Sequence, residues 1–279
     1  MVGSVGQGTA IPILGHAIKL VHVGRGGRSR NPPDRARNLR DVHAARINHN
    51  TAQWACCALV GCAGLTACIH PESAVNLYDR YLMPLLIDAG CGLKDFQALR
   101  ALLLPQATGA VLEIGIGTGR NLPFYDPARV SSLQGLDPAG QMHRKAQTRA
   151  RAAGLEVELI ALSAEQIPAP DASYDTVVCT FTLCTIPDPV TALREMRRVL
   201  KTGGKLLFCE HGRAPEAPVQ RWQDRLTPWW KPLAGGCHLN RDVRAMLSAG
   251  GFVPTQIESS YLSGPKPLVY VTRGVAVAA

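Results

Sequence analysis

Short apolar runs, separated by polar and glycine-rich segments, predict a series of buried strands beyond the first part of the chain. The runs cover residues 111–114, 131–137, 176–180, 205–211, 252–260 and 268–272. The first run contains Glu113 and leads directly into three alternate glycines. Because glycine permits a positive φ and has no Cβ to keep a ligand from the backbone, this pattern predicts a ligand-cradling loop. A plain tight turn is the alternative.

Apolar residues at helical spacing predict an amphipathic helix over residues 188–200, which the pair Gly203 and Gly204 is expected to end. Three further helices are expected at residues 78–86, 96–104 and 241–249. Residues 212–240, between the strand at 205–211 and the last helix, are rich in proline, tryptophan and basic side chains. We expect this insertion to form a lid over the ligand site.

The glycine spacing and a downstream acid narrow the choice of ligand. A dinucleotide fingerprint needs glycines at the first, third and sixth positions, but the sixth position counted from Gly115 is Arg120. Asp137 ends the second strand, where an acid is placed to accept hydrogen bonds from ribose hydroxyls. The same residue, followed by Pro138, also fits a helix N-cap. The spacing therefore disfavours a pyrophosphate on this loop.

Five blocks of the sequence, taken in order, resemble the successive motifs of class I S-adenosylmethionine-dependent methyltransferases. They lie at residues 111–119, 135–138, 163–168, 174–178 and 198–204. Further blocks resemble the small phosphatidylethanolamine N-methyltransferase-like and thiol methyltransferase-like enzymes, at residues 76–81, 121–125, 183–187, 208–211 and 236–241. The resemblance runs from about residue 75 to the C-terminus. It implies a three-layer, Rossmann-like α/β fold with a seven-stranded sheet, mostly parallel, whose last strand is antiparallel.

The resemblance implies S-adenosylmethionine as cofactor. The residues expected around it are Glu113, Gly115, Gly117, Gly119, Asn121, Asp137, Pro138, Met142, Ala164, Glu165, Thr180 and Phe181. The family pattern places Glu113 and the glycines at the methionine part, Asp137 at the ribose and Met142 near the adenine. Relatives commonly have Asp-Ala where this chain has Ser163-Ala164, so one adenine contact is weaker here or falls to the backbone.

Glu210 and His211 end the predicted strand at residues 205–211 beside the expected cleft and are the catalytic candidates. An imidazole accepts a proton near neutral pH, so His211 is a candidate base for a thiol or ammonium acceptor. The alternative is that the two side chains only hydrogen-bond to each other or to the neighbouring loop. The acceptor-site candidates implied by the resemblance and by the lid are Tyr78, Tyr81, Trp222 and His238.

The acceptor stays open between a small thiol or amine and the amine of a phospholipid. Tryptophans with arginines in the lid suit either a membrane headgroup or a small apolar pocket, and simple packing of the lid is a third possibility. An NAD(P)-dependent oxidoreductase and a non-catalytic cofactor-binding protein are the rival functions. We expect no nucleic-acid partner and no obligate protein partner, although a peripheral membrane contact fits the lid.

Residues 1–74 differ from the rest in composition. They are rich in glycine, arginine and asparagine without sustained periodicity, which is typical of a disordered leader. They also carry about half of the net charge of +9, so the basic balance is weak support for nucleic-acid binding. Because the resemblance begins abruptly near Val75, we expect a misassigned start and a methyltransferase domain over residues 75–279.

Cysteine usage gives little sign of a disulfide framework or a metal site. The leader's apolar patch holds four of the nine cysteines without paired C-x-x-C spacing, so no metal is expected. The other five, Cys91, Cys179, Cys184, Cys209 and Cys237, suit the reducing cytoplasm, which is the expected location. Cys184 is interpreted as an apolar filler rather than a nucleophile.

Overall fold

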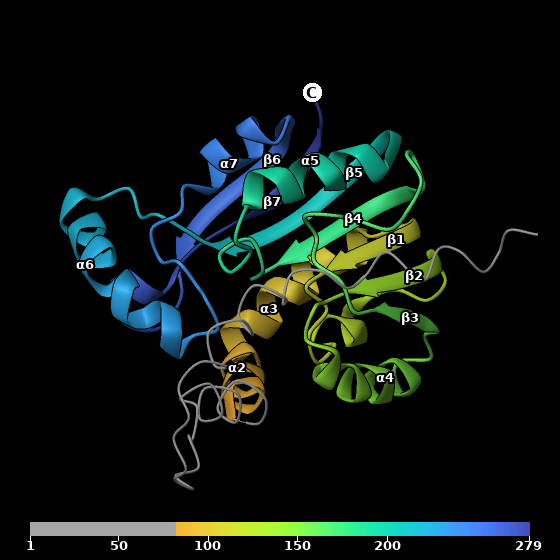
Figure 1. The fold of residues 1–279 in the computed structure, drawn as a ribbon, viewed down its shortest axis with the longest axis horizontal. Coiled ribbons are helices and arrows are strands. Elements are labelled where there is room, and N and C mark those ends of the chain that lie inside the picture. Colours follow the sequence, from red (N-terminus) through yellow and green to blue (C-terminus); the bar gives the residue numbers. More distant parts are fainter. Residues whose placement is uncertain (1–81) are drawn as a thin grey trace, which may run out of the picture. The chain divides into compact units, whose positions relative to one another are not determined.

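Seven strands form one mixed sheet in the computed structural model, which describes residues 82–279 (Figure 1). The strand order is β3-β2-β1-β4-β5-β7-β6. The strands are β1 (Gly109–Ile114), β2 (Val130–Leu136), β3 (Val157–Ile160), β4 (Tyr174–Thr180), β5 (Leu200–His211), β6 (Phe252–Tyr261) and β7 (Tyr270–Ala278). The expected leader and the two acceptor-site candidates Tyr78 and Tyr81 lie outside the described residues.

Within the described residues, β7 is the strand that runs against its neighbours. It pairs antiparallel with β5 and with β6, whereas the pairs from β3 through β5 are all parallel. This confirms the expected α/β fold with an antiparallel last strand. The strand order steps outward from β1 in one direction and from β4 in the other. Ligands of such sheets bind at the carboxyl ends of the strands that flank this switch point.

Helices cover both faces of the sheet and complete three layers (Figure 1). They are α2 (Met83–Cys91), α3 (Lys94–Leu103), α4 (His143–Ala152), α5 (Pro189–Val199), α6 (Ala217–Leu233) and α7 (Val243–Ala249). Four short 3-10 helices lie at η2 (Leu104–Gln106), η3 (Leu122–Phe124), η4 (Gly140–Met142) and η5 (Lys266–Leu268). α5 and α7 pack on the sheet face that carries Leu112 and Phe208, and α3 and α4 pack on the face that carries Val111 and Leu207.

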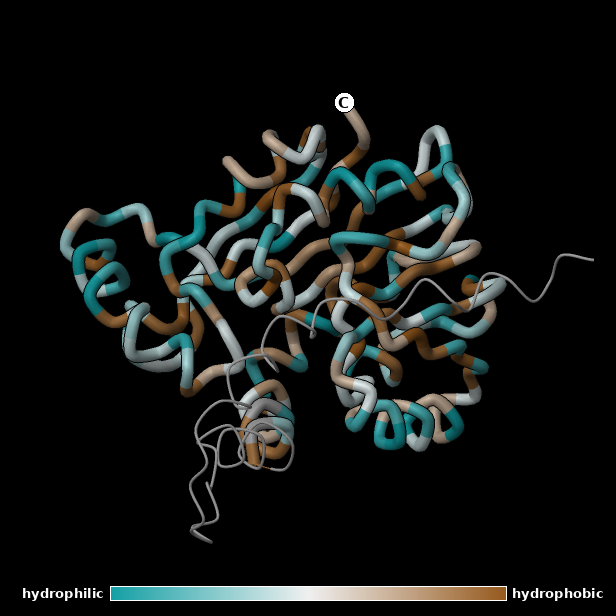
Figure 2. Tube along the Cα trace, viewed as in Figure 1, coloured by the Kyte–Doolittle hydropathy of each residue, from teal (hydrophilic) through white to brown (hydrophobic). Residues whose placement is uncertain are grey.

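The core lies between the sheet and these helix layers, and Figure 2 shows the apolar strands at its centre. β1 and β4 are apolar on both faces because helices cover both faces: Val111, Leu112 and Val178 are each 0% exposed. α4 is hydrophilic over most of its length (Figure 2) because only Ala146 and Ala150 are buried against the core. The arrangement leaves the carboxyl ends of the central strands for the site.

The junction of α5 and β5 differs from the expectation that Gly203 and Gly204 end the helix. α5 begins at the N-cap Asp188, whose carboxylate accepts hydrogen bonds from two backbone amides of the first turn. The helix ends at Val199, and Leu200 already pairs with β4. The glycines therefore lie inside β5, where the pairing register with β4 shifts and Gly203 has a φ of 79°. The expectation was wrong because the glycines serve this irregularity rather than a helix cap.

The lid expected at residues 212–240 consists mainly of α6, a helix that contains two internal prolines. Buried Gln223 holds its base, because its amide donates to the carbonyl of Gly212 and its carbonyl accepts from the backbone amide of Ala214. The backbone amide of Arg213 donates to the carbonyl of Arg241, so the two ends of the lid lie together. None of the helices in the described part of the chain combines the length and apolarity needed to cross a membrane.

Candidate functional site

The carboxyl ends of β1, β2, β4 and β5 open into one cleft, with α2 and the end of α6 at its rims. The cleft brings together most of the residues expected from the sequence. Those in its lining are Glu113, Gly115, Gly117, Asn121, Asp137, Pro138, Met142, Ala164, Thr180, Phe181 and His211. They lie at or after the carboxyl ends of five strands, β1 to β5, so the sheet positions them.

The three glycines after β1 serve two different purposes. A Cβ on Gly115 would lie 2.1 Å from Oγ1 of Thr182, and a Cβ on Gly119 would lie 2.9 Å from Cα of Ala146 in α4. A Cβ on Gly117 would meet no protein atom closer than 3.8 Å. The outer two glycines therefore allow close packing, whereas Gly117 presents open backbone to the cleft.

Asp137 ties the end of β2 to the glycine loop. Its Oδ2 accepts a hydrogen bond from the backbone amide of Gly117 at 2.9 Å, and its Oδ1 accepts from the amide of Ala139 at 2.8 Å. The next helical segment, η4, starts three residues later at Gly140, with Ala139 at its N-cap. Asp137 is therefore not a helix N-cap, and the alternative interpretation of this residue was wrong. The carboxylate stays in the cleft lining at 8% exposure.

A buried polar network supports the floor of the cleft. The Glu113 carboxylate, 1% exposed, accepts hydrogen bonds from Nδ2 of Asn121 at 3.0 Å and from the hydroxyl of Tyr125 at 2.7 Å. Asn121 also donates to Oγ1 of Thr180 and accepts from Nε of Arg100. Burial raises the pKa of Glu113 to about 7, although the bonds from Tyr125 and Asn121 oppose the shift.

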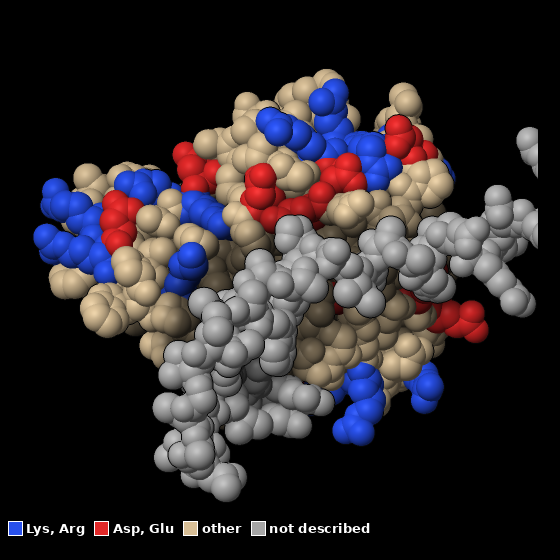
Figure 3. All heavy atoms as spheres, viewed as in Figure 1, with Lys and Arg blue, Asp and Glu red and all other residues tan. Residues whose placement is uncertain are grey.

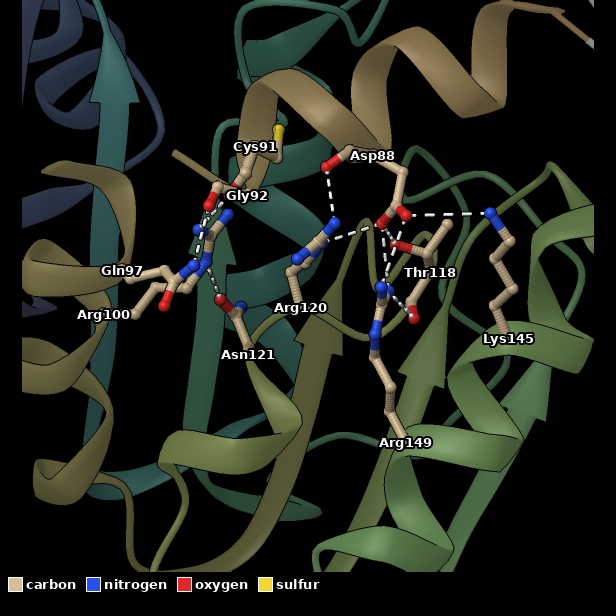
Figure 4. Close-up of polar contacts among 10 residues, drawn as sticks. All are labelled: Asp88, Cys91, Gly92, Gln97, Arg100, Thr118, Arg120, Asn121, Lys145 and Arg149. Carbon is tan, nitrogen blue, oxygen red and sulfur yellow. Dashed lines mark hydrogen bonds and ion pairs between the residues drawn. The ribbon is translucent and has the colours of Figure 1, made fainter. Parts of the chain in front are cut away.

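α2 is held over the glycine loop by Asp88, on which Arg120, Arg149 and Lys145 converge (Figure 4). The Asp88 carboxylate also accepts a hydrogen bond from Oγ1 of Thr118 at 2.6 Å. Burial acts to raise the pKa of Asp88, but the bonds from Arg149, Arg120 and Thr118 outweigh it and hold the pKa well below its usual range. This cluster fixes one rim of the cleft.

The rings of Phe96, Phe181 and His211 pack together in the cleft lining. The rings of Phe96 and Phe181 lie 4.8 Å apart, and both pack edge-on against the imidazole of His211. Phe181 has a φ of 53°, a conformation rare for a bulky side chain. Such strain costs on the order of 1–3 kcal/mol and concentrates at functional sites. It aims the ring of Phe181 into the cleft at the end of β4.

Glu210 and His211 leave β5 on opposite faces and do different things. Both carboxylate oxygens of Glu210 lie 3.0 Å from the backbone nitrogen of Thr182, which donates to them, and the residue is 0% exposed. Burial raises the pKa of Glu210 to about 7, against the bonds from the backbone amides of Thr182 and Leu183. Glu210 thus shapes the loop after β4 from behind, whereas Nε2 of half-buried His211 is buried without a hydrogen-bond partner.

Two cysteines join His211 at the far end of the cleft. The sulfur atoms of Cys184 and Cys237 and a ring nitrogen of His211 all lie within 4.8 Å of one another. The neighbouring Cys184 thiol lowers the pKa of Cys237, and His211 and Trp230 act in the same direction, while burial opposes them. Nε1 of Trp230 is also buried without a partner. Sequence reasoning did not find this cluster, because its members stand far apart in the chain and share no motif.

Five expected site residues lie outside the cleft lining. They are Gly119, Glu165, Glu210, Trp222 and His238. Glu165 accepts hydrogen bonds from Ser163 and from the backbone amide of Asp188, which secures the start of α5. Trp222 is 55% exposed on α6, and the backbone amide of His238 donates to the carbonyl of Cys184 at 2.8 Å.

The lining fits the expected S-adenosylmethionine. The open backbone at Gly117 lies next to the Asp137 carboxylate, where an acceptor for ribose hydroxyls is needed. Glu113 adds a second acid, which suits a ligand that carries an ammonium and a sulfonium. Met142 and Ala164 line the cleft on the side of β2 and the segment after β3, where an adenine finds apolar walls.

Comparison with known proteins agrees with this geometry. Residues 112–208 match the family described as "Methyltransferase domain". Human thiol S-methyltransferase TMT1B is 33% identical over 181 residues, which cover 64% of this chain and 72% of the human protein. The rat TMT1B is 35% identical over 152 residues, 53% of this chain, and the match spans 62% of the rat protein's length.

Other relatives differ in their acceptors. The phosphatidylethanolamine N-methyltransferase of Cereibacter sphaeroides is 35% identical over 113 residues, 40% of this chain and 55% of that protein. A Leishmania major SAM-dependent methyltransferase shares the fold, with a TM-score of 0.54 at 16% identity over 74% of this chain and 85% of that one. The chain therefore belongs to the S-adenosylmethionine-dependent methyltransferases, with S-adenosylmethionine as its cofactor.

Proposed function

We propose that this methyltransferase acts on small apolar thiols. The observation that carries the proposal is the far end of the cleft, where an unpartnered imidazole nitrogen of His211 lies among Phe96, Phe181 and two cysteines. An apolar group that bears one ionisable hydrogen would suit this lining. The thiol S-methyltransferase activity named for the human and rat relatives points to the same acceptor class.

In this proposal the bound cofactor supplies an electrophilic methyl group on a positively charged sulfur. His211 accepts the proton of the acceptor thiol, because only the thiolate is a strong nucleophile. The rings of Phe96 and Phe181 exclude water and orient the acceptor. Transfer breaks the bond from the methyl carbon to the sulfonium and forms a thioether. Glu210 is a positioning residue, since its carboxylate fixes the loop that carries Thr182 and Phe181.

A phospholipid amine is the second candidate acceptor. Trp222 and Trp229 are 55% and 77% exposed on α6, and the same helix carries Arg221 and Arg225. Figure 3 shows Lys and Arg side chains gathered over α6. Aromatic and basic side chains together suit a headgroup surface, and one relative is named for phosphatidylethanolamine.

The test is methyl transfer from labelled S-adenosylmethionine to four acceptors: an alkyl thiol, an aromatic thiol, a small amine and phosphatidylethanolamine vesicles. We expect both thiols to be labelled. Labelled lipid without labelled thiol would move the assignment to the second candidate. No labelled acceptor, in protein that binds S-adenosylhomocysteine by calorimetry, would contradict the proposal.

The His211→Ala variant tests the role of the imidazole. We expect its rate to fall about 100-fold or more with the alkyl thiol, as for loss of a general base. The loss should be much smaller with an aromatic thiol, which is already ionised near neutral pH. An equal loss with both thiols, at unchanged binding of S-adenosylhomocysteine, would make His211 structural rather than a proton acceptor.

A further inference from the structure

We propose that Cys184, His211 and Cys237 bind one zinc ion, with an open coordination position that takes the acceptor thiol. The three residues come from the loop after β4, the end of β5 and the segment after α6, so the ion would join sheet and lid. The argument for zinc binding uses only the geometry of these side chains. The ion's role in catalysis rests on the proposed thiol methyltransferase function.

The distances are close to those of a metal site. The ligand atoms lie within 4.8 Å of one another, whereas the ligands of tetrahedral zinc stand about 3.5–3.8 Å apart at the usual bond lengths. Closing the site requires shifts of at most about 1 Å, which side-chain rotation on two loops can supply. The backbone is already held, since the amide of His238 donates to the carbonyl of Cys184 and Arg241 donates to the carbonyl of Ile186.

The chemistry of the ligands selects the metal. Two thiolates and one imidazole are soft donors that favour zinc over magnesium or calcium. Two thiolate charges neutralise a divalent ion, so the complete site carries no net charge into a buried region. Three protein ligands with one open position are typical of catalytic rather than structural zinc.

Unpaired polar atoms beside the cluster support this assignment. Nε2 of His211 and Nε1 of Trp230 are both buried without a hydrogen-bond partner, which is uncommon in a folded protein. Metal binding gives the imidazole nitrogen a lone-pair acceptor. Trp230 and Cys237 line the same cleft, so the indole N–H is available to a metal-bound thiolate, the kind of supporting contact that metal ligands commonly have.

The open position faces the acceptor end of the cleft, because Cys184, His211 and Cys237 all line it. In the zinc-loaded site His211 would act through the ion instead of as a free base: an incoming thiol would bind the ion as a thiolate and release its proton to water, so the loss of alkyl-thiol activity expected for His211→Ala still holds. The thiolate sulfur then forms its bond to the methyl carbon as the carbon–sulfonium bond breaks. The thioether product is a weak ligand and leaves the ion.

The first experiment measures zinc in the full chain by elemental analysis after purification without chelators. We expect the Cys184→Ser and Cys237→Ser variants each to lose about one equivalent of zinc relative to the unaltered chain. Cys91→Ser is the matched control, because its thiol also lines the cleft but stands outside the cluster. The four leader cysteines are present in every variant, so the difference isolates the proposed site. Equal zinc in all variants would overturn the proposal.

Cobalt substitution tests the geometry and the open position. The cobalt-loaded chain should show a thiolate-to-cobalt charge-transfer band and the visible bands of a tetrahedral site, and both should disappear in the Cys237→Ser variant. Adding an alkyl thiol should shift the visible bands, because the thiol becomes the fourth ligand. A spectrum that ignores the Cys237 substitution would overturn the site, and one that ignores added thiol would overturn the open position.

Methylation assays separate this proposal from the proposed function. If chelator-treated chain without zinc methylates thiols at the full rate, the metal's catalytic role fails while the thiol activity stands. If the chain binds zinc at this cluster but labels no thiol, the site stands and the proposed acceptor fails. Binding of S-adenosylhomocysteine by each variant shows that the fold survived the substitution.

Discussion

The two ends of the cleft are built in opposite ways. At the donor end, the carboxylates of Asp137 and Glu113 have their oxygens paired with backbone amides, Asn121 and Tyr125. At the acceptor end, His211 and Trp230 keep buried nitrogens without partners. The donor end is therefore a finished hydrogen-bonded structure, whereas the acceptor end holds polar groups that await a ligand.

The difference teaches where each task is performed. The proposed donor end consists of open loop backbone and of carboxylates whose oxygens are already hydrogen-bonded, so we expect it to resist change. The acceptor end depends on side chains from three segments, two of which are loops. Substitutions should therefore act through stability and donor affinity at one end and through acceptor chemistry at the other.

The largest effect is expected from Gly115→Ala at the donor end. The new Cβ would lie 2.1 Å from Oγ1 of Thr182, at a φ of 70°. Overpacking and a left-handed conformation together cost about 2–5 kcal/mol. We expect thermal unfolding to show a large drop in Tm, together with loss of S-adenosylhomocysteine binding. Gly117→Ala is the matched control, since its Cβ meets nothing within 3.8 Å; it should fold but bind the donor weakly. Equal stability of the two variants would contradict this account.

Glu113 should make stability depend on pH. Its pKa is raised from 4.5 to about 7 in the folded chain, so its contribution is fully present below pH 4.5 and is lost as pH rises to about 7. The slope reaches about 1.4 kcal/mol per pH unit for one proton. Denaturant titrations of Glu113→Gln across this window should show a slope smaller by that amount, while the slope from Glu210, whose pKa is also raised to about 7, remains. Parallel pH curves for the variant and the unaltered chain would show that Glu113 is not the group responsible.

The Asp88→Asn variant should weaken donor binding more than it weakens the fold. The substitution leaves Arg120, Arg149 and Lys145 facing one another without the shared anion. A partly exposed cluster of this kind is worth about 1 kcal/mol, so we expect donor affinity to fall about fivefold. Calorimetry with S-adenosylhomocysteine measures the affinity, and hydrogen exchange of α2 amides reports its release. Unchanged hydrogen exchange of the α2 amides would show that the Asp88 cluster does not hold this helix in place.

The smallest effects are expected on the lid. Trp229→Ala removes a ring that is 77% exposed, so stability and thiol methylation should stay within about 0.5 kcal/mol and twofold of the unaltered chain. Trp230→Phe removes a buried, unpartnered N–H; stability should hold while thiol methylation falls. Of these two variants, only Trp229→Ala should weaken binding to vesicles. A loss of thiol methylation in Trp229→Ala would show that the exposed side of α6 contributes to the acceptor site.

Local patterns accounted for the parts of the site that lie close together in the sequence. The glycine loop and Asp137 were recognisable because a strand, a turn and a second strand form one continuous unit. Gly203 and Gly204 led to a wrong prediction. Two adjacent glycines occur at a helix end or in an irregular strand, and only the pairing with β4 distinguishes the two. Local sequence patterns thus identified residues that the fold brings together in one cleft.

His211 was a candidate from the sequence, but its cluster with Cys184 and Cys237 escaped prediction because the cluster exists only after the chain folds. Cys184, His211 and Cys237 come from segments whose proximity depends on the order of β4 and β5 and on the path of the lid. Glu210 was singled out as a catalytic candidate, but its orientation behind the loop follows from strand alternation and from the amide of Thr182. The hydrophobic periodicity of the sequence does not show which loop the Glu210 carboxylate contacts.

The backbone hydrogen bond between Arg213 and Arg241 holds the two ends of the intervening segment together. The segment between them leaves and rejoins the core at one place, so exchanging it for another sequence imposes no change on the sheet. Chains of different length are tolerated at such a junction because closure entropy grows only slowly with length. Replacing the segment between Arg213 and Arg241 can therefore change the acceptor while the proposed donor site keeps its sequence.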